Sequence, residues 1–148
     1  MMKDVGFSIA YSALAAMMLA ACSSSPDLTV SSMNFLQAPI SPTCARDALL
    51  TEEGFSVNAP MGKRGGATEI KAMFNGDLPV TSLIRTQPDG TAEVSFFVKL
   101  SPKATPLDRR EAEFAVRRAD EAVYRKCTED GKIYGGDVVI DAEKSPKQ

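Results

Sequence analysis

The sequence contains no histidine and no tryptophan among its 148 residues. Without histidine, the usual general base of Ser-His and Cys-His sites and the commonest metal ligand are both missing. Without tryptophan, one common stacking platform for sugars is missing too. Lysine nucleophiles and carboxylate dyads remain as catalytic alternatives, but Glu52-Glu53 and Asp108 with Glu111 fall on an expected helix end and a charged helix face, where solvated acids are routine. We therefore predict a protein that is not an enzyme and that holds no cofactor and no metal ion.

The chain also lacks an excess of charge of one sign, since 17 basic residues face 19 acidic ones. This balance argues against nucleic acid and against an anionic membrane surface as a partner. Two basic groups suggest an anionic ligand, but each has a simpler explanation as a solvated surface. Glutamates four residues before Arg117 and Arg125 give the spacing of surface ion pairs, and Lys63-Arg64-Gly65-Gly66 lacks the Gly-Lys-Ser/Thr end of a P-loop. The sequence thus indicates no small-molecule ligand.

Long apolar runs are equally scarce, and the main one lies near the N-terminus. It extends from Val5 to Ala21 without a charged residue, and Lys3 precedes it. A membrane-spanning helix needs about 20 apolar residues, so this shorter run is typical of a secretory signal. Its end, Leu19-Ala20-Ala21-Cys22, resembles the lipobox of bacterial lipoproteins. That resemblance implies removal of residues 1–21, a diacylglyceryl group on Cys22 and often a further acyl chain. An ordinary cleaved signal and an uncleaved anchor are the alternatives.

Acylation of Cys22, commonly with palmitate, would attach the mature chain durably to a membrane, because two or three chains anchor far better than one. Residues 22–40 are then expected to form the lipid tether with a linker or arm, beginning with the polar stretch Ser23 to Pro26. In lipoproteins an aspartate after the cysteine favours the inner membrane. Ser23 therefore suggests the outer membrane of a Gram-negative bacterium, with the domain on the periplasmic side.

The two remaining cysteines, Cys44 and Cys127, are an even number in a chain predicted to be exported, which favours a disulfide bond. The alternative is a pair of buried free thiols. A redox-active pair is disfavoured because the sequence has no Cys-x-x-Cys motif.

Residues 41–141 are predicted to form a single α+β domain, and residues 142–148 a disordered tail. Ser41-Pro42 and Thr105-Pro106 are typical N-terminal ends of helices, which we expect over 42–53 and 106–129. The long helix should present one apolar stripe that includes Leu107 and Phe114. Pro88-Asp89-Gly90 predicts a hairpin turn. Further strands are expected at 55–57, 68–74 and 132–141, and residues 28–36 form either short strands or an extended arm.

The expected architecture is a single antiparallel sheet of about four to five strands, packed against a long C-terminal helix and a shorter N-terminal helix. The order hairpin, helix and last strand resembles the C-terminal module of TonB-type periplasmic transducers, through Asp89-Gly90, Ser101, Leu107-Asp108 and Ala115-Val116. That family's aromatic and proline stretch after the helix is missing. We predict a binding or assembly component of the cell envelope with a protein partner at an exposed sheet edge. A structural or surface lipoprotein without a dedicated ligand is the alternative.

Overall fold

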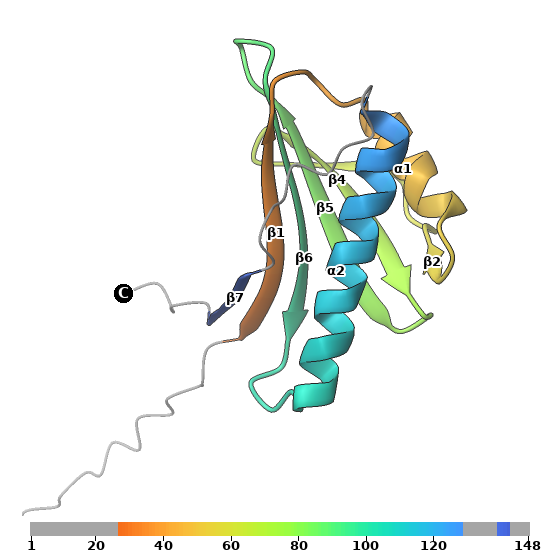
Figure 1. The fold of residues 1–148 in the computed structure, drawn as a ribbon, viewed down its shortest axis with the longest axis vertical. Helices are drawn as coiled ribbons and strands as arrows, with labels where there is room; N and C mark the ends of the chain where they lie inside the picture. Colours follow the sequence, from red (N-terminus) through yellow and green to blue (C-terminus); the bar gives the residue numbers. More distant parts are fainter. Residues whose placement is uncertain (1–26, 129–138, 143–148) are drawn as a thin grey trace, which may run out of the picture.

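The computed structural model describes residues 27–128 and 139–142. Its centre is one antiparallel sheet, in which the strands follow the order β2-β4-β5-β6-β1-β7 and β3 pairs with β4 (Figure 1). The strands are β1 (Leu28–Leu36), β2 (Phe55–Ser56), β3 (Gly62–Arg64), β4 (Ala67–Phe74), β5 (Leu78–Thr86), β6 (Ala92–Leu100) and β7 (Val139–Ala142). The α+β prediction is confirmed. The sheet has more strands than the four to five expected, because residues 28–36, left open as short strands or an arm, form β1, and because β3 is too short to show an alternating pattern.

Two helices, α1 (Pro42–Thr51) and α2 (Pro106–Cys127), cover one face of this sheet. The expected starts of both helices are present, since the side chains of Ser41 and Thr105 accept hydrogen bonds from the third residue of each helix. Asp108 completes a capping box with Thr105. Small alanines on α2 allow it to lie close to the strands. The core between the layers includes Val30, Ile70, Val80, Val94, Phe96, Ala115, Ala119 and Val123.

The predicted apolar stripe of α2 is wrong at two positions. Leu107 is 73% exposed and Phe114 is 52% exposed, whereas Ala112, Ala115, Val116 and Ala119 are buried. Leu107 lies in the first turn of the helix. Phe114 lies at the edge of the interface between helix and sheet. Its ring contacts that of Phe74 edge-on, at a centroid distance of 5.9 Å.

The two helices are joined covalently. Cys44 in α1 and Cys127 at the end of α2 form the predicted disulfide, with their Cα atoms 5.9 Å apart. At the C-terminal end of α1, Glu52 forms ion pairs with Arg118 and Arg125 of α2. The expected pairing of Arg125 with Glu121 within one helix is therefore replaced by a contact between helices.

The N-terminal strand settles one of the alternatives that the sequence leaves open. Residues 28–36 form one continuous strand that pairs with β6 along its whole length, from Leu28–Leu100 to Leu36–Ala92. The sheet therefore begins inside the segment assigned to tether and arm. Residues 1–26, which include the expected signal and Cys22, lie outside the described residues. Residues 143–148 also lie outside them, and so do residues 132–138, the first part of the expected last strand. The described part of that strand is β7, which ends at Ala142, one residue later than expected.

Candidate interaction surface

In part of β1, polar side chains point toward the core and apolar side chains point toward solvent. Ser32 and Asn34 point toward the helices and are 1% and 5% exposed. Met33 and Phe35 point to the uncovered face of the sheet and are 52% and 68% exposed. A strand that is half-buried ordinarily directs its apolar side chains inward. From Ser32 to Phe35 the arrangement is the reverse, whereas Val30 and Leu36 on either side point inward and are buried.

Asp120 of α2 holds Ser32 and Asn34 on the inner face. The hydroxyl of Ser32 donates to Oδ2 of Asp120 at 3.1 Å, and Nδ2 of Asn34 donates to Oδ1 at 3.0 Å. Shifting β1 by one residue would turn Met33 and Phe35 inward, but it would also leave the buried carboxylate without these donors. The polar cluster thus keeps Met33 and Phe35 exposed.

The same cluster contains two perturbed ionisable groups. Burial raises the pKa of Asp120 to about 6, although the hydrogen bonds from Ser32 and Asn34 oppose the shift. Burial, and then the charge of Asp120, raises the pKa of Tyr124. The Tyr124 hydroxyl is buried and has no hydrogen-bond partner among the described residues. The cluster is closed to solvent, so it acts on the orientation of β1 and offers no substrate site.

Within the described residues, the outer edge of β1 is paired only along its first half. β7 pairs with it from Leu28–Ala142 to Ser31–Val139. From Ser32 to Leu36, no strand of 27–128 or 139–142 lies along that edge. Backbone groups on such an edge are available to a further strand. We call this edge from Ser32 to Leu36, together with the side chains of Met33 and Phe35, the β1 edge surface.

Away from β1, the face of the sheet that the helices leave uncovered is more polar, and residues of β3 and the turn after it cover part of it. Phe97, which the alternation of β6 places on this face, lies under the guanidinium of Arg64, 5.7 Å from its ring centroid. Arg85 donates to the carbonyl of Gly65 at 2.8 Å. The turn after β3 is thus fixed to the sheet by Arg85. Lys63 donates to Thr68 at 2.9 Å, so these basic side chains contact groups within the fold.

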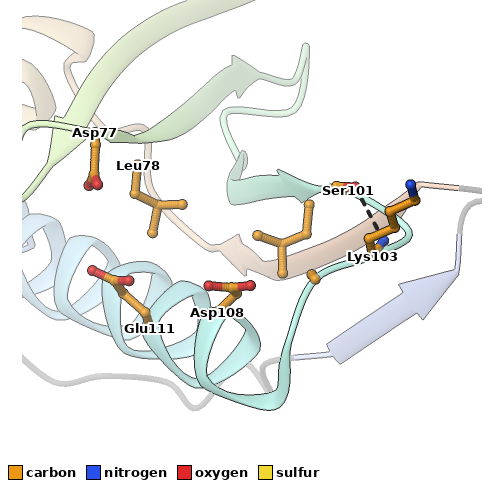
Figure 2. Close-up of a pocket in the computed structure, with 8 residues that line it drawn as sticks. Asp77, Leu78, Ser101, Lys103, Asp108 and Glu111 are labelled. Carbon is orange, nitrogen blue, oxygen red and sulfur yellow. Dashed lines mark hydrogen bonds between the residues drawn. The ribbon is translucent and has the colours of Figure 1, made fainter.

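One hollow, of about 300 Å³, lies at the opposite end of β1, between the β4–β5 turn and the start of α2. Asp77, Asp108 and Glu111 line it together with Lys103 (Figure 2). Asp108 is committed to the helix cap, where the backbone N–H of Thr105 and then its hydroxyl lower the pKa of the carboxyl. No group of side chains in the described part of the chain has an arrangement suited to a metal ion.

The structure brings together only two of the residues singled out in the sequence as sites, Cys44 and Cys127. The lipidation candidate Cys22 lies outside the described residues. Sequence reasoning missed the exposure of Met33 and Phe35. The local signal was ambiguous, because Met33, Asn34, Phe35 and Leu36 form a nearly apolar run in which either face could be inward.

Comparison of this chain with protein-family models, with curated proteins and with solved structures finds no match. None of the helices within the described ranges is long and apolar enough to cross a membrane.

Proposed function

We propose that this protein is a lipoprotein of the bacterial cell envelope, anchored through acyl chains on Cys22, that binds a partner protein at the β1 edge surface. It faces the periplasm from the outer membrane and works without catalysis. The observation that supports binding is the reversed polarity of β1, which exposes Met33 and Phe35 beside a length of edge that no strand of the described residues pairs with. The anchor is supported by the signal-like N-terminus and the lipobox resemblance.

The partner segment is expected to be extended. A strand added at this edge gains affinity from main-chain hydrogen bonds and specificity from side chains at alternate positions. Met33 and Phe35 are two residues apart and lie on the same face, so they favour apolar side chains at every second residue of the incoming strand. The edge from Ser32 to Leu36, unpaired among the described residues, is five residues long, which is close to the length of an ordinary strand.

Site-specific photo-crosslinking in intact cells tests the binding proposal. A photoreactive phenylalanine analogue replaces Phe35, and a matched variant carries it in place of Leu50, an apolar residue of α1 that is 43% exposed. We expect a discrete heavier band from position 35 and none from position 50. Only monomer from position 35 would favour the second candidate, a structural lipoprotein without a dedicated ligand.

Intact mass of the protein from membranes tests the anchor. A chain that begins at Cys22 and carries two or three acyl groups is the expected result. A chain that begins elsewhere, or that carries no acyl group, would contradict it. The hairpin, helix and last strand of the TonB-type layout are present in order as β5–β6, α2 and β7. Membership of that family remains a prediction.

A further inference from the structure

The end of the domain nearest the predicted anchor carries an exposed apolar side chain. Leu107, in the first turn of α2, is 73% exposed, the highest value for a large apolar side chain in the described part of the chain. The neighbouring residues Pro102, Lys103, Pro106 and Arg110 are exposed as well. Single exposed leucines are common on proteins, so the position of Leu107 in the fold is what matters.

The strand pairing places Leu107 at the same end of the domain as the chain that leads to Cys22. Leu28, the first residue of β1, pairs with Leu100, the last residue of β6. A short connection then leads from Leu100 to Pro106, where α2 begins. In Figure 1 the start of β1, the end of β6 and the first turn of α2 all lie at the lower end of the domain.

The available length of chain keeps this end close to a bilayer. Asp27 is five residues after Cys22, and each residue spans at most about 3.6 Å, so the two lie within about 18 Å in any conformation. By comparison, α2 has 22 residues, which corresponds to about 33 Å at the helical rise. A lipid anchor on Cys22 therefore holds the lower end of the domain within reach of the headgroups, while leaving the opposite end free to stand away from them.

We infer that the first turn of α2 contacts the lipid bilayer through Leu107, which enters the interface between headgroups and acyl chains. This inference rests on the proposed lipidation of Cys22. Lys103 and Arg110 flank Leu107, but Asp77, Asp108 and Glu111 lie at the same end. These acidic groups offset the cations, so the contact depends on the apolar side chain and only weakly on anionic lipid. The contact orients the domain with the β1 edge surface directed away from the bilayer.

Tryptophan fluorescence tests the contact without interference, because the sequence has no tryptophan of its own. The full-length lipoprotein with Leu107→Trp is purified from membranes and reconstituted into phosphatidylcholine vesicles with and without brominated acyl chains. The matched control is Gln37→Trp, at an exposed position just beyond the other end of β1. Circular dichroism checks that both variants fold, which is expected because both positions are exposed.

We expect the emission of the residue-107 variant to shift to shorter wavelength and to be quenched at least about twofold more by bromolipid than the residue-37 variant. Equal quenching in a protein whose mass shows acylated Cys22 would overturn the bilayer contact and leave the proposed anchor intact. A mass without acyl groups would overturn both. Replacing a third of the lipid by an anionic lipid should change the quenching little, and a large increase would contradict the apolar basis of the contact.

Discussion

Asn34 of β1 donates a hydrogen bond to Asp120 of α2 at 3.0 Å, across 86 positions of the sequence. With the parallel bond from Ser32, this contact determines which side of the first strand faces the core. An inward-facing polar residue is therefore the reason that two large apolar residues are exposed.

Replacing Asp120 by asparagine should raise stability at neutral pH and remove a pH dependence. The pKa of Asp120 is about 6 in the folded protein, above the usual value of 3.8 for an aspartate carboxyl. The folded state then binds more protons between these pH values, so the free energy of unfolding decreases as pH rises from about 4 to 6. The full shift corresponds to roughly 3 kcal/mol. Urea unfolding of Asp120→Asn from pH 4 to 8 should lack this decrease, and a decrease equal to that of the parent protein would contradict the assignment.

Removing the Tyr124 hydroxyl should be neutral or stabilising. The hydroxyl is buried without a partner in the described ranges and lies close enough to Asp120 to feel its charge. Loss of an unsatisfied buried polar group is worth about 1 kcal/mol. Tyr124→Phe should therefore unfold at an equal or higher urea concentration. Tyr124→Ala is the control and should lose about 3–5 kcal/mol through the cavity it leaves. A phenylalanine variant as unstable as the alanine variant would imply a hydrogen bond to this hydroxyl.

Breaking the disulfide should weaken the domain substantially. The bridge closes a loop with a sequence separation of 83, for which chain-entropy arguments give about 4 kcal/mol. Cys44→Ser with Cys127→Ser should lower the free energy of unfolding by about that amount, as should reduction of the parent protein. The double variant itself should be insensitive to reductant. Equal stability of the parent protein with and without reductant would show that the bridge does not constrain the unfolded chain.

The exposed pair on β1 should contribute little to folding. Thr has a high strand propensity, so Met33→Thr with Phe35→Thr should change stability by no more than about 0.5 kcal/mol, as is usual at exposed sites. The neighbouring core substitution Leu36→Ala, at a side chain that is 7% exposed, should cost about 2–4 kcal/mol. Denaturant unfolding separates these cases. A large loss in the double threonine variant would mean that the pair serves packing and not binding.

Local signals in the sequence were sufficient for much of the fold. The caps at Ser41 and Thr105, the Pro88-Asp89-Gly90 turn and the pairing of Cys44 with Cys127 each depend on residues close in sequence or on simple counting. The orientation of the two faces of β1 does not depend on such local signals. Residues 32–36 contain two polar and three apolar side chains. Which face of this strand points inward depends on Asp120, and local patterns place that residue on a helix without indicating what it contacts. The exposure of Leu107 was missed for a related reason, because helical spacing alone does not show that the first turn of α2 lies beyond the buried part of the stripe.

The position of β1 also determines how the fold would carry a mechanical load. A pull on the chain ahead of Leu28 acts along the strand axis, and β6 is paired with that strand over all nine of its residues. Hydrogen bonds perpendicular to the pull are then strained together in shear instead of being opened one after another from an end. A force between the N-terminal chain and a molecule gripping Met33 or Phe35 would be transmitted through a single strand, and the helices and their disulfide would stay outside the line of tension.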